Sequence, residues 1–258
     1  MTGNAKSMAV KGVHFLWQHL LLLISLNLMT LGVALCVRSN LGSGVISALP
    51  MAFSLAGTES LMPALTIGEY TNIMNIIFVS LQVVLLRRRF QPVQLFQILV
   101  GFVFGLLIDM NMELISGVDF ETLPNQIAAQ IIGCTILGIG ISAEIRCGSI
   151  TMPGEGIQIA ISRLSGMSFG KTKIIVDCAL VGLTVAASFL FWGTWRWAII
   201  GPGTLFAMIY IGWFVKKMSP RMGWFDRLLG ADRGMGRYIY GLLRLKKSSE
   251  KSEKDLVE

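Results

Sequence analysis

Six apolar segments, each close to the length that crosses a bilayer, constrain this chain more than any other feature of its sequence. A transmembrane helix needs about 20 mostly apolar residues, because the hydrocarbon core is about 30 Å thick. The six segments lie approximately at 14–37, 70–86, 92–112, 126–143, 174–192 and 197–215. Only 14% of the residues are charged, whereas soluble domains carry about 25%. The sequence therefore predicts an all-α membrane protein with several spans.

The same order of signals occurs twice along the chain. Gly42 and Ser43 follow the first long segment and match Gly148 and Ser149 at an offset of 106 residues. Residues 68–75 match residues 170–177 at an offset of 102. Internal repeats in a strongly apolar chain are typical of membrane transporters and channels.

A shorter apolar segment follows each Gly-Ser pair, at residues 45–55 and 157–164. Both are about half a span long, which predicts a re-entrant or interfacial helix. Interrupted backbone at membrane depth must be buried in protein or face water. Two such segments at matching positions therefore predict the functional site.

Charged residues divide between the loops on the two sides of the predicted spans. Lys and Arg resist translocation, so we place the N-terminus and most basic residues in the cytoplasm. The residues expected inside are Lys6, Lys11, Arg87, Arg88, Arg89, Arg146, Arg163, Lys171, Lys173, Lys216, Lys217 and Arg221. The residues expected outside are Arg38 and Arg196 with Glu59, Glu69, Glu113, Asp119 and Glu121.

This topology has three spans in each copy. Because three is an odd number, the second copy starts on the opposite side of the membrane and has the opposite orientation to the first. We thus predict six transmembrane helices arranged as two inverted-topology three-helix repeats, each with a short re-entrant or interfacial helix. The N-terminal repeat covers residues 1–113 and the C-terminal repeat covers 114–221. Residues 222–258 combine basic and apolar residues, which predicts an amphipathic segment on the inner leaflet and a disordered tail.

The glycine-rich breaks are the candidate substrate site. A helix that starts at such a break presents unpaired N–H groups, which bind anions and carboxylates. The substrate-binding candidates are Gly42, Ser43, Gly44, Gly148 and Ser149, with Arg38 and Arg146 as sources of positive charge. The alternative is that both arginines reach the lipid headgroups and the glycines only turn the chain.

Asp177 is a carboxylate inside a predicted span, and Asn75 is its counterpart in the first copy. Ionisable residues in spans are costly and usually face an aqueous cavity, so we predict a proton-coupling role for Asp177 with Asn75 and Asn72. The alternative is that Asp177 is hydrated near the cytoplasmic surface or pairs with Lys173, one helical turn earlier.

Other motifs indicate packing. Gly101 with Gly105, and Gly203 with Ala207, have the spacing that lets two helices approach closely. The four cysteines lack metal-ligand spacing, and no nucleophile or cofactor motif is present, so we expect no enzyme, metal or cofactor. The expected partners are the lipid bilayer and a small solute, with no nucleic acid. The sequence leaves a homo-oligomer open.

The turn from Arg38 to Gly44, the glycines Gly68 and Gly170, Asp177 and the Gly203-Thr204 pair resemble the YczE/YitT-like family of bacterial inner-membrane proteins. The resemblance covers roughly residues 15–215. It implies a multi-pass protein of the bacterial inner membrane, for which the charge pattern predicts two cytoplasmic termini. The sequence of residues 153–155, Pro-Gly-Glu, departs from the Gly-Pro-x-Asp-like turn usual in that family, which leaves the binding role of this loop open.

The leading functional hypothesis is a secondary transporter, an importer or exporter coupled to protons, for a small anionic or zwitterionic metabolite. A passive channel is a close alternative. The alternative from another class is a non-transporting membrane protein that recruits cytoplasmic proteins through its basic tail.

Overall fold

The computed structural model is a bundle of helices, and it describes residues 2–147, 150–167 and 169–229. No β-strand occurs within these ranges. Five helices are long and apolar enough to cross a membrane. They are α1 (Thr2–Arg38), α3 (Ile67–Leu86), α4 (Phe96–Leu114), α5 (Leu123–Cys147) and α7 (Phe169–Trp192). The chain is therefore a multi-span helical membrane protein, as its sequence predicts.

The sixth expected segment, 197–215, forms a shorter helix than the sequence suggests. Helix α8 (Pro202–Met218) has 17 residues and begins at a proline. Proline lacks the N–H that would bond to a preceding turn, so it favours the first position of a helix. The apolar residues before Pro202 form a turn, in which Ile199 O accepts a hydrogen bond from Ser43 N at 3.2 Å.

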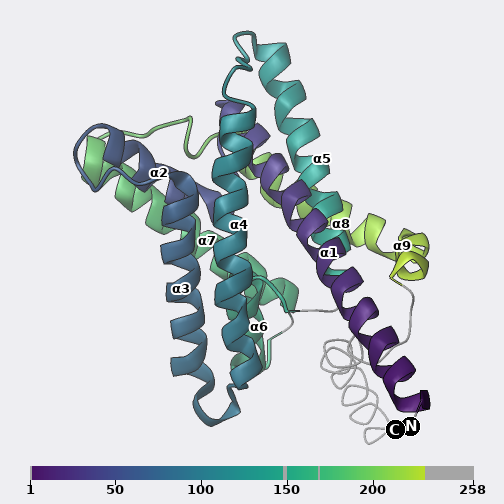
Figure 1. Ribbon diagram of the computed structural model, residues 1–258. Coiled ribbons are helices and arrows are strands. Elements are labelled where there is room, and N and C mark those ends of the chain that lie inside the picture. Colours follow the sequence, from purple (N-terminus) through teal and green to yellow (C-terminus); the bar gives the residue numbers. More distant parts are fainter. Residues whose placement is uncertain (1, 148–149, 168, 230–258) are drawn as a thin grey trace, which may run out of the picture.

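The two short helices that the sequence predicts are present. Helix α2 (Val45–Thr58) has 14 residues and α6 (Pro153–Ser165) has 13. Helix α2 packs against α7 and α3, and α6 packs against α3 and α7. Figure 1 shows α2 and α6 towards opposite ends of the bundle. Short helices η1 (Arg87–Arg89), η2 (Pro92–Leu95), η3 (Ser219–Arg221) and α9 (Gly223–Leu228) complete the described chain.

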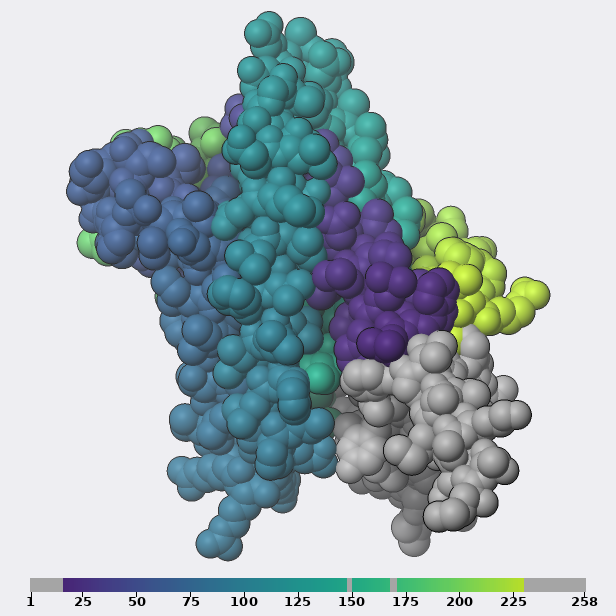
Figure 2. All heavy atoms as spheres, in the orientation of Figure 1, coloured from purple at the N-terminus to yellow at the C-terminus, as the bar shows by residue number. Residues whose placement is uncertain are grey.

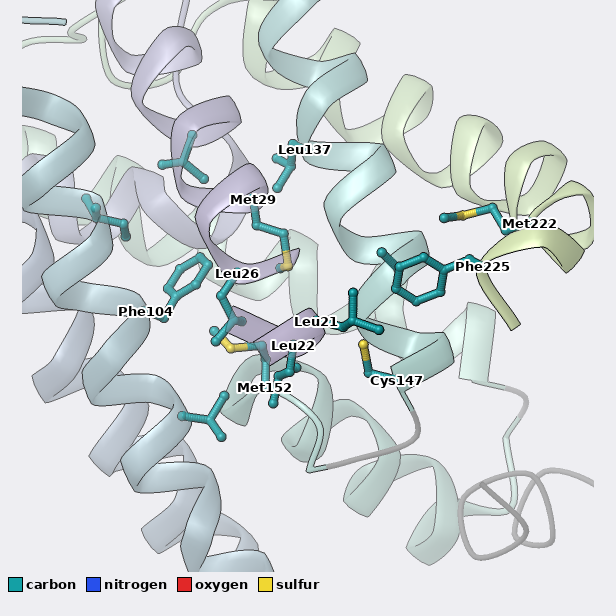
Figure 3. Packing of buried hydrophobic residues seen from close by; sticks show 14 of the residues in the cluster. Leu21, Leu22, Leu26, Met29, Phe104, Leu137, Cys147, Met152, Met222 and Phe225 are labelled. Atoms are coloured by element: carbon teal, nitrogen blue, oxygen red, sulfur yellow. The ribbon is translucent and has the colours of Figure 1, made fainter. Parts of the chain in front are cut away.

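Helices α1 and α5 cross in close contact at the centre of the bundle (Figure 1). A Cβ atom on Gly32 of α1 would lie 2.6 Å from both Gly133 O and Leu137 N of α5. The main apolar cluster surrounds this crossing, and Figure 3 shows Met152 beside Leu22 and Leu26 of α1. On the face drawn in Figure 2, α1 and α4 lie side by side and cover the interior.

The two small-residue motifs pack helices closely, as predicted, but against different partners. Gly101 and Gly105 of α4 lie against the side chains of Asn75 and Asn72 of α3. Gly203 of α8 faces Leu41 O and the Gln130 side chain. Ala207, one turn further, packs with Cys36 and Cys134 in a small buried cluster.

Charged side chains connect the elements at one end of the bundle, which we call the Arg38 end. Arg38 at the end of α1 bonds to Asp119, at 2.6 Å, in the loop between α4 and α5. Glu59, after α2, pairs with Arg196, after α7, at 2.9 Å. The opposite end, the Arg87 end, carries Arg87, Arg88 and Arg89 after α3.

Large apolar side chains are exposed along the spans between the two ends. On α3 and α4 these include Ile73, Ile77, Leu99, Phe102 and Leu106. Large exposed apolar surfaces are rare on soluble monomers, and lipid tails solvate them without cost. These surfaces associate the protein with a lipid bilayer.

Candidate functional site

A cavity of about 110 Å³ lies inside the bundle, and we call it the central cavity. Every helix from α1 to α8 contributes at least one residue to its wall. Most of the wall is apolar. The polar side chains in it are Ser47, Thr71, Asn75, Glu155, Lys173 and Asp177.

Both short helices begin at this cavity. Gly44 caps α2 without any side-chain hydrogen bond, and Val45 and Ile46 of the first turn line the wall. The first N–H groups of a helix have no partner within the helix, and they form its positive end. The start of α2 therefore supplies uncapped donors and positive potential beside the cavity.

The start of α6 has different chemistry. Met152 N donates a hydrogen bond to Glu144 Oε1 at 3.1 Å, and Pro153, the first residue of α6, has no N–H. Glu155 follows in the first turn and lines the cavity. One short helix thus offers free donors, whereas the other is surrounded by carboxyl groups.

Gly42 and Ser43 support the turn and do not line the cavity. Gly42 has φ +111°, and a Cβ there would lie 2.5 Å from Gly201 N, so only glycine fits this conformation and space. Ser43 is fully buried, and its hydroxyl donates to the carbonyl of Ile199 at 3.4 Å. Gly148 and Ser149, the matching pair, lie outside the described residues.

Asp177 lines the central cavity and also makes the ion pair that the sequence raised as an alternative. Its Oδ2 lies 2.8 Å from Lys173 Nζ, one turn earlier on α7, and its side chain is only 4% exposed. Gln158 Nε2 of α6 donates to Asp177 Oδ1 at 3.4 Å, and Gln158 Oε1 has no hydrogen-bond partner. The wall therefore contains a fixed pair of opposite charges on one face of α7.

The two asparagines have different positions. Asn75 lines the central cavity, is 3% exposed, and donates to Gly101 O at 3.4 Å. Asn72 contacts Gly105 at the interface between α3 and α4, and its Oδ1 has no hydrogen-bond partner. The structure thus brings Asn75, but not Asn72, to the same cavity as Asp177.

The two candidate arginines bind other segments of the chain at opposite ends of the bundle. Arg38 donates to the carbonyls of Ser116 and Val118, at 2.7 and 2.8 Å, and to Asp119. Arg146 donates to Asp226 of α9 and to the carbonyl of Ser219. Neither arginine lines the central cavity.

A second, open pocket of about 470 Å³ lies at the Arg38 end, and we call it the vestibule. Four helices line both the vestibule and the central cavity with residues one helical turn apart. The pairs are Val37 and Val33 on α1, Met51 and Ser47 on α2, Ile67 and Thr71 on α3, and Met112 and Ile108 on α4. The vestibule and the central cavity are therefore neighbours along these four helices, and the vestibule residues at this boundary are apolar.

Three acidic residues have roles that sequence reasoning did not assign. Asp109 of α4 accepts from Gly68 N at 2.8 Å and from Thr66 Oγ1 at 2.6 Å, so it caps the start of α3. Glu144 is 3% exposed and accepts a hydrogen bond from Met152 N, and Glu155 lines the central cavity. A carboxylate inside an apolar segment is the signal that could have found Asp109.

The described residues contain no group of three or more His, Cys, Asp or Glu side chains that could hold a metal ion. No curated protein matches this chain, and no solved structure matches it. Residues 16–220 match the model of a family of unknown function, DUF6198. This match covers most of the chain, and the protein belongs to that family.

Proposed function

We propose that this protein is a secondary transporter of a small zwitterionic metabolite and that the central cavity is its substrate site. The observation that carries the proposal is the charge arrangement of the cavity. The uncapped start of α2 and Lys173 supply positive potential, and Asp177 and Glu155 supply negative charge. A zwitterion can pair its carboxylate with the helix start and its ammonium group with the carboxylates.

The packing supports the further proposal of six spans in two inverted repeats, with α8 as the sixth crossing. Contacts in one half have counterparts in the other half. Helix α2 packs on α7 as α6 packs on α3, and α1 packs on α4 as α5 packs on α8. Transporters with inverted repeats bind their substrates between the repeats, beside interrupted helices.

The topology in this proposal places the Arg87 end in the cytoplasm and the Arg38 end outside. The positive-inside rule supports it, because Arg87, Arg88 and Arg89 lie in one short loop between two spans. The first short helix, α2, then re-enters the membrane from outside. The N-terminus and the C-terminus of the chain both lie in the cytoplasm in this proposal. We assign the protein to the bacterial inner membrane on its resemblance to YczE/YitT-like proteins.

The apolar residues at the boundary between the vestibule and the central cavity support a transporter more than an open passive channel. An open channel requires a continuous path for its solute, whereas a transporter closes its site on at least one side. Here Val37, Met51, Ile67 and Met112 line the vestibule one turn away from the cavity wall. Coupling of protons through Asp177 stays a prediction.

The partner-recruiting alternative depends on the basic segment, most of which lies outside the described residues. Its test requires a truncation that leaves the bundle intact. Met222, Phe225 and Leu229 belong to the main apolar cluster, so the chain should be cut after Leu229. A transporter keeps its flux in this truncated form, whereas a protein that acts through the tail loses its function.

The proposal is tested by solute-dependent currents and counterflow in proteoliposomes that contain the purified protein. Pools of small zwitterions, including glycine, alanine and glycine betaine, are applied under a pH gradient. We expect saturable transport that Lys173→Gln abolishes. The control is Lys171→Gln, which removes an exposed lysine from the same turn of α7 and should transport like the wild type.

Two outcomes would overturn the proposal. Absence of both current and counterflow for every pool would exclude a transporter of this substrate class, because counterflow also detects electroneutral transport. Equal transport by the Lys173→Gln and Lys171→Gln variants would remove the central cavity as the substrate site.

A further inference from the structure

We infer that the transported zwitterion is an α-amino acid with an aliphatic side chain. Its two charged groups face α2, α6 and α7, and its side chain lies against α1, α4 and α5. This inference rests on the proposed function, because it names the substrate class of the same central cavity. It adds a requirement that a general transporter of zwitterions does not have, namely a preference for apolar side chains.

The wall of the central cavity divides into a polar side and an apolar side according to helix. Among the described residues that line the cavity, the polar side chains belong to α2, α3, α6 and α7. The residues from α1, α4, α5 and α8 are all apolar or glycine. On α1, α4 and α5 they are Met29, Val33, Phe104, Ile108, Leu137 and Ile141.

The same division appears in the packing of the helices. Helix α2 packs on α3 and α7, and α6 packs on the same two helices. Helix α1 packs on α4 and α5, and α8 packs on α5. The helices of each group therefore adjoin one another, so the polar residues form one continuous side of the cavity and the apolar residues form another.

The apolar side is part of the main apolar cluster. Met29, Val33, Phe104, Ile108 and Leu137 all belong to this cluster, and each is between 1% and 8% exposed. Figure 3 shows Met29, Phe104 and Leu137, which come from three different helices. A substrate group that contacts this side is therefore in apolar surroundings that continue behind the wall.

The polar side chains next to this side in the sequence have hydrogen-bond partners elsewhere. Thr30 Oγ1 donates to Asn27 O at 3.0 Å and accepts from Asn111 Nδ2 at 2.9 Å. Ser142 Oγ donates to Gly138 O at 2.7 Å. A substrate hydroxyl or amide against the apolar side would lose its hydration without gaining a hydrogen bond, which costs free energy. An aliphatic group gains free energy there, because its burial removes apolar surface from water.

The charged groups of the cavity lie on the polar side only. Lys173 and Asp177 form a pair at 2.8 Å on α7, Glu155 is on α6, and α7 packs against α6 and α2. A zwitterion must present both of its charges to this side while its apolar part faces the other. An α-amino acid meets this condition, because one carbon carries the carboxylate, the ammonium group and the side chain. A zwitterion with a charge at each end of an aliphatic chain does not.

The test is counterflow of radiolabelled amino acids in proteoliposomes that contain the full-length protein. Valine and threonine are the main pair, because they have the same shape and differ by one hydroxyl group. An apolar pocket discriminates against such a hydroxyl by about 10²-fold, and we expect uptake to favour valine by about that factor. We expect no uptake of γ-aminobutyrate, whose charges lie at opposite ends of the chain. Uptake of threonine equal to that of valine would overturn the inference.

The orientation of the bound amino acid is tested by a matched pair of variants. Val33 and Val37 lie one turn apart on α1 and are each 6% exposed, but only Val33 lines the central cavity. Val33→Thr adds a hydrogen-bonding group to the apolar side, and it should lower the preference for valine over threonine by about fivefold. Val37→Thr is the control and should keep the wild-type preference. Equal preferences in both variants would overturn the placement of the side chain against α1. The wild-type comparison tests the substrate class if Val33→Thr does not fold.

Failure of the inference and failure of the proposed function give different results. Counterflow of glycine and threonine that matches that of valine would leave the transporter proposal intact and exclude the aliphatic substrate. Absence of counterflow for every zwitterion would overturn the transporter. Binding is then measured by the melting temperature of the purified protein, because a ligand stabilises the folded state that binds it. A larger increase with valine than with threonine would support the assigned site chemistry, and equal melting temperatures would overturn it.

Discussion

Replacement of Gly32 by alanine should destabilise the bundle at the crossing of α1 and α5. The added Cβ would lie 2.6 Å from Gly133 O and from Leu137 N, which is 0.8 Å less than the 3.4 Å at which ordinary contacts begin. Both neighbours are backbone atoms of α5, so no side-chain rotation can relieve the overlap. The two helices would have to separate along their shared core.

The magnitude follows from two opposing effects. Overpacking of a well-packed core costs about 1–3 kcal/mol, whereas glycine to alanine in the middle of a helix gains about 1 kcal/mol. Gly182, in the interior of α7, is the matched control, because nothing lies within 4 Å of a Cβ placed there. The gain is common to both variants. The difference between them therefore isolates the overpacking cost of about 1–3 kcal/mol.

The assay is equilibrium unfolding of both variants in mixed micelles, followed by the fluorescence of the six tryptophans. We expect Gly182→Ala to match or exceed the wild type in free energy of unfolding, and Gly32→Ala to fall below Gly182→Ala by about 1–3 kcal/mol. Equal free energies for the two variants would refute the close crossing of α1 and α5.

Three further predictions concern the cap of α3, the topology and the C-terminal elements. Asp109→Ala should lower the free energy of unfolding by about 1–2 kcal/mol, because Gly68 N and Thr66 Oγ1 lose their acceptor. A free energy of unfolding equal to that of the control variant Glu113→Ala would refute this cap. In a Cys178→Ser background, a cysteine at Glu121 should react with a membrane-impermeant maleimide in intact cells, and one at Arg88 only after lysis; labelling of both from outside would reverse the proposed topology at Arg88. Truncation after Arg221 should lower the melting temperature, because it removes Phe225 and Leu229 from the core. Truncation after Leu229 should leave the melting temperature unchanged. Equal melting temperatures for the two truncated forms would show that α9 adds no stability.

The sequence predicts the spans well where an apolar run is uninterrupted. The five long helices coincide with predicted segments because the bilayer demands a fixed length of apolar helix. The sixth segment does not form one long helix, because its first residues are apolar in order to be buried in a turn and not in order to cross a bilayer. Ile199 is fully buried, and its carbonyl accepts from Ser43 in the first break. That contact joins residues more than 150 positions apart, and no local pattern contains it.

The sequence predicts which types of residue reach the candidate site better than it predicts which residues contact one another. A polar side chain within a span has to avoid lipid, and this alone brings Asn75 and Asp177 to the central cavity. The positions of Arg38 and Arg146 depend instead on segments distant in sequence, a loop at residues 116–119 and two short helices at residues 219–226. Glu144 accepts a hydrogen bond from Met152 N, and no pattern in the sequence contains that contact.

The two small-residue motifs are equivalent in sequence, yet they join different helices. Gly101 and Gly105 hold α4 against α3, whereas Gly203 and Ala207 hold α8 against α5 and the end of α1. Helix α3 packs along α4, while α7 and α8 make almost no contact within the described residues. In the proposed inverted-repeat transporter, alternating access requires such a difference in packing, because each state must place two similar halves in different arrangements. In the proposed transporter, the contact between α3 and α4 therefore belongs to the conformation described above. Loss of that contact and formation of one between α7 and α8 would convert the transporter into the conformation that opens to the other side of the membrane.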